Sequence, residues 1–284
     1  MIQVSQIWRY PVKSMQGERL QDVVLSERGI RGDRVWAVRD EVRGGIRGAK
    51  KIPALMRCRS RYLEPPSSDA VVAAEISLPD GTTVMSDASS VSADLSAALG
   101  HEVTLWPLQP ATDLDHYRRG APDHDDLETE LREMFAVTPE EDLPDLSKLP
   151  PQVFEFESPP GTYFDAFPLL IVSEASLARL AELTPESRID VRRFRPNLLL
   201  SSNDGASGFA EMEWIGRRFR LGECEIAIET ECPRCVMTTL GFADLPKDPV
   251  IMRTLVREAD HNFGVYAGVA RGGMVRVGDT LEEI

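Results

Sequence analysis

Cysteine is scarce in this chain, with four residues in 284. Disulfide frameworks belong mainly to small, cysteine-rich secreted domains. The start of the sequence also lacks the basic segment and apolar block of a secretory leader. These features argue against a disulfide scaffold and against an internal iron–sulfur cluster alongside another cysteine function. Any electrons that the protein needs are therefore expected to come from a partner.

Long apolar runs and glycine-rich phosphate loops are also missing. No window approaches the ~18 uninterrupted apolar residues of a membrane-spanning helix, and neither GxGxxG nor GxxxxGK occurs. The formal net charge of -14 argues against a general nucleic-acid or anionic-membrane surface, because phosphates attract basic faces. We expect a soluble, cytoplasmic protein, and its charged surface favours a monomer.

The charge is unevenly distributed along the sequence. Residues 28–61 hold eleven Lys and Arg against three acids, whereas residues 113–157 hold fourteen acids against four bases. The basic stretch predicts that something anionic sits against it. The acidic stretch is rich in proline and is interpreted as a solvated insertion, either a flexible connection or a flap.

The first 108 residues are expected to form a β-barrel domain. An apolar content of 42% indicates a globular chain, and its length favours two domains, at roughly 150 residues per domain. Short alternating stretches separated by glycine-rich turns are typical of a barrel. The expected strands are 3–10, 20–25, 34–40, 55–63, 71–78, which ends in a hairpin signal, and 102–106. A helix over 88–100, stopped by Gly100, precedes the last of them.

Residues 109–150 are expected to be a linker with one helix at 125–135, and residues 151–284 a second domain. An apolar strand leads into a helix whose start is marked by Ser173, and such a junction suits an anion. The other expected elements are strands at 197–202, 217–221, 224–230, 235–240, 263–269 and 274–279 and a helix at 249–259. The predicted fold is a β-rich α+β fold of two barrels with a few peripheral helices.

The motif Cys232-Pro233-Arg234-Cys235 follows an alternating strand in which Cys224 is expected to face the core. Structural zinc would need a second cysteine or histidine pair, which the sequence lacks. A redox dithiol would need a helix after the motif, but the following residues favour a strand. Two ordinary small residues in a turn remain possible. In the last interpretation one thiolate ligates a soft metal ion, and the neighbouring Arg234 lowers the pKa of the thiol and favours its deprotonation.

A second polar cluster surrounds Arg195 and Asn197, just before an apolar strand. An arginine cluster in this position can simply be a solvated edge. A cofactor with a phosphate and a hydrogen-bonding heterocycle explains it better, because Arg offers a bidentate fork and Asn both donates and accepts. Lys13 and Ser14 place an amine and a hydroxyl at another turn, although that pair alone is a weak signal.

The order of the short motifs extends this interpretation. From residue 1 to residue 280 the chain shows, in order, PVKS, GDRVWAV, KKIPAL, LLIVSEASL, RFRPN, CPRCVMTT, FGVY and VRVGD. This series resembles the family named for the molybdenum-cofactor sulfurase C-terminal (MOSC) domain with its N-terminal β-barrel partner. The resemblance is weakest across 108–150. It implies a MOSC domain in the second half of the chain.

By this resemblance Cys235 would be the molybdenum ligand and the catalytic residue, and the cofactor would be the molybdenum–molybdopterin (Moco) group. The residues implied to line the pterin pocket are Lys13, Ser14, Arg34, Ser173, Ser176, Arg195, Asn197, Arg234 and Tyr266. Cys232 is not assigned to the metal, and its simplest interpretation is a buried small residue. A pocket drawn from both halves would also account for the basic excess.

The resemblance implies an oxidoreductase that removes oxygen from small N-hydroxylated compounds. Electrons would come from an external donor of the reductase, ferredoxin or cytochrome type. Asp165 is a possible proton donor. We expect neither the membrane anchor nor the ferredoxin domain of better-known members, which leaves donor and substrate open. The alternative is a cofactor or sulfur carrier in which Cys235 holds a persulfide.

Overall fold

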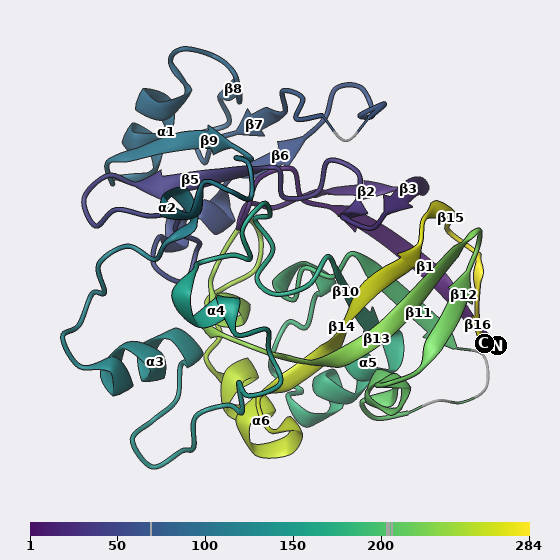
Figure 1. The fold of residues 1–284 in the computed structure, drawn as a ribbon. Coiled ribbons are helices and arrows are strands. Elements are labelled where there is room, and N and C mark those ends of the chain that lie inside the picture. The colour runs from purple at the N-terminus through teal and green to yellow at the C-terminus, as the bar shows by residue number, and fades with distance from the viewer. Residues whose placement is uncertain (69, 203–204, 206) are drawn as a thin grey trace.

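The computed structural model describes residues 1–68, 70–202, 205 and 207–284, and a closed seven-stranded barrel is its central feature (Figure 1). The strand order is β11-β10-β14-β13-β12-β16-β1, and the pairing of β1 with β11 closes the ring. The barrel strands are β1 (Ile2–Arg9), β10 (Leu169–Ser173), β11 (Leu198–Ser202), β12 (Arg218–Leu221), β13 (Cys224–Pro233), β14 (Asn262–Arg271) and β16 (Thr280–Glu283). One barrel strand therefore comes from the extreme N-terminus.

Alternating burial along β13 shows why these residues form a barrel. Cys224, Ile226 and Ile228 point into the core and are at most 2% exposed, while residues between them are more accessible. The period of two is the signature of a strand with one buried face. Cys224 is thus a core residue, as the sequence predicted.

Smaller sheets pack against the barrel core and against a second core in the N-terminal half. β2 (Glu18–Leu20) extends the barrel sheet beside β1, and β3 (Asp22–Ser26) pairs with β4 (Gly29–Ile30) and β15 (Gly273–Arg276). The remaining pairs are β5 (Trp36–Asp40) with β9 (Val103–Pro107), and β6 (Arg59–Arg61) with β7 (Glu75–Ser77) and β8 (Thr83–Met85). This core also contains Met237 and Leu240. The C-terminal half therefore contributes to both cores.

The helices lie at the periphery, as Figure 1 shows. They are α1 (Val91–Leu99), α2 (Leu114–Tyr117), α3 (Leu127–Phe135), α4 (Gln152–Glu155), α5 (Glu174–Leu183) and α6 (Val250–Ala259). Four 3-10 turns occur among the described residues, η1 (Pro53–Arg57), η2 (Val191–Arg193), η3 (Ala210–Trp214) and η4 (Val236–Thr239). None of the described helices combines the length and the apolar character needed to cross a membrane.

The β-rich α+β class is confirmed, and so are two predicted helix boundaries. The Ser173 hydroxyl caps α5 by accepting from the Ser176 amide, and Gly100 ends α1 in a left-handed conformation with φ 64°. The strand predicted at 235–240 is wrong, because η4 occupies it. The Thr238 and Thr239 hydroxyls donate to carbonyls three residues earlier, which stabilises a tight turn against their β-propensity.

The strand predicted at 55–63 is only partly correct, since η1 occupies its start and β6 its later part. Pro53 at the first turn of η1 favours the helical conformation. The strand predicted at 71–78 is shorter than expected and covers only β7.

The acidic segment 113–157, called the strap below, is docked rather than free. Asp123 pairs with Lys51 at 2.9 Å and with Arg47 at 3.1 Å, and Glu130 pairs with Lys51 at 2.5 Å. The strap also buries aromatic side chains such as Tyr117. Part of the basic stretch is therefore neutralised by the chain's own acids, which corrects the interpretation of a solvated insertion.

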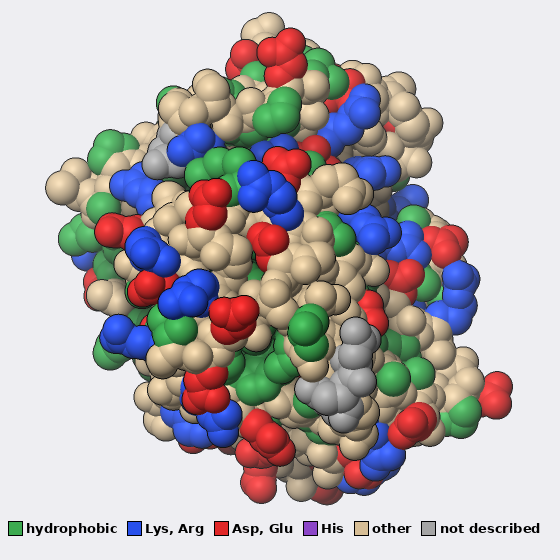
Figure 2. Space-filling view, turned by 90° about the vertical axis from the view of Figure 1, so that its right-hand side faces the viewer, with side chains coloured by type: hydrophobic (Ala, Val, Ile, Leu, Met, Phe, Trp, Pro, Cys, Tyr) green, Lys and Arg blue, Asp and Glu red, His purple; other side chains and the backbone are tan. Residues whose placement is uncertain are grey.

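The face seen in Figure 2 carries interleaved charges of both signs. Arg217 lies 3.3 Å from Glu283 and Arg271 lies 3.1 Å from Glu225, both across neighbouring strands. The face in this view is therefore neither uniformly acidic nor uniformly basic.

Candidate functional site

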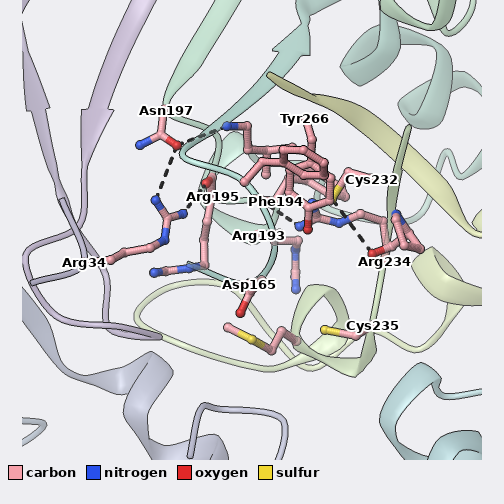
Figure 3. Close-up of a pocket in the computed structure, with 14 residues that line it drawn as sticks. Arg34, Asp165, Arg193, Phe194, Arg195, Asn197, Cys232, Arg234, Cys235 and Tyr266 are labelled. Atoms are coloured by element: carbon pink, nitrogen blue, oxygen red, sulfur yellow. Dashed lines mark hydrogen bonds between the residues drawn. The ribbon is translucent and has the colours of Figure 1, made fainter. Parts of the chain in front are cut away.

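A pocket containing about 550 Å³ of empty space, its open mouth included, lies at one end of the barrel (Figure 3). It is lined by Arg34, Tyr266 and residues of three segments, 165–170, 193–197 and 232–237. The first segment runs into the start of β10, the second ends just before β11, and the third comprises the end of β13 and the turn that follows it. Of the residues that the resemblance implied, Arg34, Arg195, Asn197, Arg234, Cys235 and Tyr266 meet here.

One side of the pocket is built around Arg195. Its guanidinium lies 4.2 Å from the centroid of the Tyr10 ring and donates to the Met15 carbonyl. Arg195 is 6% exposed and forms no ion pair with the described carboxylates. Burial, aided by repulsion from Arg34, lowers the pKa of Arg195 to about 10. The side chain stays charged at neutral pH, so this wall presents a buried cation without a carboxylate.

Asn197 fixes the neighbouring groups in place. Its Oδ1 accepts from the Leu170 amide at 3.1 Å and from Arg34 Nη1 at 3.3 Å, and its Nδ2 donates to Asp33 at 3.1 Å. Asp33 is also bonded to Arg34. Arg34 and Arg195 both have positive φ angles, 50° and 56°. Such strained backbone at two pocket arginines is typical of functional sites.

The thiol side of the pocket contains Cys232, Arg234 and Cys235. Arg234 Nη1 donates to Cys232 Sγ at 3.0 Å and its Nη2 donates to the Phe194 carbonyl at 2.7 Å, whereas its Nε is buried without a partner. Cys232 is 2% exposed, and burial raises the pKa of its thiol. Cys235 is more accessible, and its sulfur makes no hydrogen bond within the described residues. Arg234 therefore holds the Cys232 sulfur by a hydrogen bond, and the Cys235 thiol is left open to the pocket.

Lys13 and Ser14 lie behind the pocket wall. Lys13 is 3% exposed, and its ammonium donates to Asp165 at 2.7 Å and to the Tyr163 carbonyl at 3.1 Å. Burial alone would raise the pKa of Asp165, but Lys13, Lys50 and Arg34 hold it far below its usual range. A carboxylate in this state has no proton to donate. The suggestion that Asp165 is a proton donor therefore fails.

Ser173 and Ser176 are not brought into the pocket. Both hydroxyls donate to one oxygen of Glu211, which is buried beside the N-terminus of α5. The anion at this helix N-terminus is thus a side chain of the protein itself. The cofactor contact predicted for Ser173 and Ser176 is not met, because their hydroxyls are bonded to Glu211. The sequence could not reveal that η3 places this carboxyl group beside α5.

The sequence did not single out Arg193 and Phe194, which line the pocket, or Lys50, whose charge acts on Asp165. Arg193 is fully buried and donates to the carbonyls of Arg188, Thr238, Leu240 and Pro246. It thereby anchors the loop that follows Cys235. The KKIPAL motif contained the signal for Lys50, but nothing in the motif distinguished Lys50 from Lys51.

The pocket fits an anionic group that brings its own metal ligands. Arg193, Arg195 and Arg234 carry charges without a carboxylate partner, and Arg234 Nε is an orphaned buried donor. Among the described residues no three His, Cys, Asp or Glu side chains are grouped to hold a metal. The structural zinc alternative therefore lacks ligands, whereas a single thiolate can complete the coordination of a metal held by a cofactor.

Family comparisons match both halves of the chain. The family model of the MOSC domain matches residues 159–282, and the family model of the MOSC N-terminal beta barrel domain matches residues 1–109. Mitochondrial amidoxime reducing component 2 of Bos taurus is 27% identical over 306 residues, which cover 99% of this chain and 83% of the relative. Mitochondrial amidoxime-reducing component 1 of Homo sapiens is also 27% identical, and the match covers 98% of this chain and 82% of the relative.

Other matches are shorter or more distant. Molybdenum cofactor sulfurase 2 of Culex quinquefasciatus is 29% identical over 34% of this chain and 14% of its own length. Among solved structures, the YUAD protein from Bacillus subtilis matches all of this chain and 96% of its own, with 13% identity and a TM-score of 0.43. YiiM from Escherichia coli covers 42% of this chain and 54% of its own, with 17% identity and a TM-score of 0.31.

Proposed function

The chain belongs to the family of MOSC-domain proteins with an N-terminal MOSC beta barrel domain, and from this we propose that it is a molybdenum-cofactor reductase of small N-hydroxylated compounds. Two relatives that match nearly the whole of this chain are named amidoxime reducing components, and these names support reductive chemistry at an N–OH group. Electrons would come from an external donor of the reductase, ferredoxin or cytochrome type.

The observation that carries the proposal is the convergence of several guanidinium groups, of which Arg195 and Arg234 have no carboxylate partner among the described residues, with an open thiol in one pocket. Arg34, Arg195 and Asn197 offer donors to the phosphate and heterocycle of a molybdopterin. Cys235 offers a soft sulfur ligand without a competing partner. The wall formed by Tyr266 and Phe167, whose ring centroids lie 5.4 Å apart, suits a flat ligand.

The bound cofactor would supply the two-electron oxygen-acceptor chemistry, and the chain would supply orientation and electrostatics. Arg195 and Arg234 would hold negative charge in a site shielded from water, where such interactions are strongest. The Lys13–Asp165 pair would keep Asp165 ionised and fixed at the pocket floor. Arg193 would hold the loop that positions Cys235.

Cys235→Ala tests this proposal when the protein is expressed in cells with intact cofactor synthesis. Wild type should contain close to one molybdenum and one pterin per chain and reduce benzamidoxime with reduced viologen as the donor. Cys235→Ala should lose molybdenum and at least ~100-fold of this activity. Cys58→Ala is the matched control, because Cys58 is fully buried in the N-terminal core. Full activity in Cys235→Ala would contradict the proposal.

A cofactor or sulfur carrier would behave differently at the same residue. Its Cys235 would react with iodoacetamide, and its molybdenum would exchange during dialysis. The reductase reading predicts retained metal and protection of Cys235 from alkylation until the cofactor is removed. Rapid alkylation of the metal-loaded protein would favour the carrier.

A further inference from the structure

A second pocket, called the side pocket below, lies next to the pocket of Figure 3, called the cofactor pocket. The side pocket contains about 410 Å³ of empty space, its open mouth included. Residues within 26–35 form one wall, and Leu108 with residues 161–164 forms the other. Arg34 lines both pockets, and Phe164 of the side pocket directly precedes Asp165 of the cofactor pocket. The two cavities therefore share one guanidinium group.

Both walls of the side pocket are held in place by the protein itself. The Gly32 carbonyl accepts from the Tyr62 hydroxyl at 2.9 Å, and a Cβ atom on Gly32 would lie 2.8 Å from the Tyr62 ring. In the other wall, the Thr162 amide and hydroxyl both donate to the Pro159 carbonyl, at 3.0 and 2.8 Å. Sites for small molecules are usually formed in advance in this way, because binding then has to order little of the chain.

The lining of the side pocket is basic, although the protein as a whole is acidic. It contains one carboxylate, that of Asp33, and the guanidinium groups of Arg28, Arg31 and Arg34. Asp33 is buried and already accepts from Arg34 and from the Tyr10 amide, the latter at 2.6 Å. The Arg28 side chain forms neither a hydrogen bond nor an ion pair with the part of the chain that the structure describes. The lining therefore carries more positive than negative charge.

These arginines belong to the start of the basic stretch 28–61, for which the sequence predicted an anionic partner. The acids of the strap neutralise a later part of that stretch, where Asp123 pairs with Arg47 and Lys51. Within the described residues, no acid of the strap pairs with Arg28 or Arg34. The strap therefore does not supply the anion expected at the side pocket.

The remaining lining of the side pocket is largely apolar. Its apolar side chains are Ile30, Val35, Leu108 and Phe164. An apolar cavity with a few charged groups beside it suits an amphipathic ligand, whose apolar body displaces water while the guanidinium groups bind its acid. The planar fork of arginine matches a carboxylate in particular. Inorganic phosphate would gain nothing from the apolar side chains.

We propose that the side pocket binds a small carboxylic acid with an apolar body, in its carboxylate form, through Arg28 and the neighbouring arginines. This inference goes beyond the proposed function, because the ligand occupies a cavity other than the cofactor pocket. A ligand in this position contacts Arg34, whose Nη1 donates to Asn197 Oδ1 at 3.3 Å in the cofactor pocket. The two sites are thus linked by a single side chain.

Ligands that differ in charge but hardly in shape test the inference. Phenylacetate should bind about tenfold more tightly than phenylacetamide, because a charge-assisted bond to arginine favours the carboxylate. Acetate should bind more weakly than phenylacetate, because it lacks the apolar body. Binding is followed by the NMR shifts of the Gly32 and Gly161 amides, which belong to the two walls. Equal affinities for phenylacetate and phenylacetamide would overturn the inference.

Variants of Arg28 show whether this side chain supplies the selectivity. Arg28→Met should remove most of the preference for phenylacetate, and Arg28→Lys should retain part of it. Arg218→Met is the matched control, because it removes the same charge from an exposed position on β12 that lines neither pocket. It should leave the preference unchanged. Undiminished selectivity in Arg28→Met would contradict the proposal.

The titration is independent of catalysis and is made on protein of known molybdenum and pterin content. Phenylacetate should shift the Gly32 and Gly161 amides whether or not the cofactor is present. Shifts confined to Arg234 and Cys235 would place the ligand in the cofactor pocket, and binding to cofactor-free protein alone would assign the side pocket to the cofactor. Either result would overturn the inference. Binding at the side pocket by a protein that reduces no N-hydroxylated compound would support the inference and refute the proposed function alone.

Discussion

Two arginines separated by one residue have opposite roles in this protein. Arg193 is fully buried and satisfies four backbone carbonyls, whereas Arg195 donates to one carbonyl and otherwise faces the pocket. The motif predicted Arg195 as a pocket residue, and Arg195 does line the pocket. The sequence could not distinguish the two arginines, because three of the four carbonyls that Arg193 binds belong to a loop about 50 residues further along the chain.

This contrast makes a prediction at the level of single residues. Arg193→Met should lower the free energy of unfolding by about 2–4 kcal/mol, because it leaves buried carbonyls unsatisfied. Arg195→Met should change the stability of the cofactor-free protein by less than about 1 kcal/mol, because it removes a charge that is costly to bury. It should nevertheless abolish pterin retention. Urea unfolding of both apoproteins, combined with pterin analysis, checks this, and a strongly destabilised Arg195→Met would contradict it.

At the level of elements, the strap depends on ion pairs that connect it to both halves of the molecule. Lys51 joins it to the N-terminal half through Asp123 and Glu130, and Arg253 of α6 joins it to the C-terminal half through Glu141. The composition of residues 113–157 predicted a flexible segment. Composition could not reveal that the excess acids of the strap and the excess bases of residues 28–61 lie against each other.

Acid should therefore release the strap before it unfolds the barrel. Burial raises the pKa values of Asp123 and Glu130, but Lys51 and, at Asp123, Arg47 lower them below the ordinary 3.8 and 4.5. A carboxyl whose pKa is lowered by folding contributes stability above its unfolded pKa and loses it as the pH falls through the folded value. The protection factors of the α3 amides against hydrogen exchange, which correct for the intrinsic pH dependence of exchange, should fall below about pH 4.5, and in Lys51→Met they should be low already at pH 7. An equal fall in α5, which packs on the barrel, would show global unfolding instead.

Local signals explain which elements were predictable. The cap of α5 at Ser173 and the end of α1 at Gly100 depend on residues within a turn of each other, and both were predicted correctly. η4 was predicted as a strand because Val236 and the threonines favour strands locally. Besides the local bonds of Thr238 and Thr239, long-range contacts hold its conformation: Met237 packs in the N-terminal core, and the Thr238 and Leu240 carbonyls accept from Arg193. Interactions at such separations are not encoded in the local pattern.

At the scale of the whole molecule, the barrel is discontinuous in sequence. β1 lies between β11 and β16, with Ile7 opposite Leu198 and Ile2 opposite Leu281. A strand from the first residues therefore closes a barrel whose other strands lie between residues 169 and 283. The sequence correctly predicted that the pocket draws on both halves. It could not predict this pairing, because the partners lie about 190 residues apart.

The fragment 110–284 should consequently fail to fold on its own. Without β1, the edges of β11 and β16 would be unpaired and Val4 and Ile7 would be missing from the barrel core. A circular permutant should fold if it starts at residue 110, joins Ile284 to Met1 by a short glycine linker and ends at residue 109. The termini lie side by side in Figure 1, and Pro110, where the chain would be opened, is exposed. Circular dichroism and calorimetry should show an unfolded fragment and a permutant with one cooperative transition, as in the intact chain. A fragment with its own cooperative melting transition would show that β1 is dispensable and that the two halves are independent folding units.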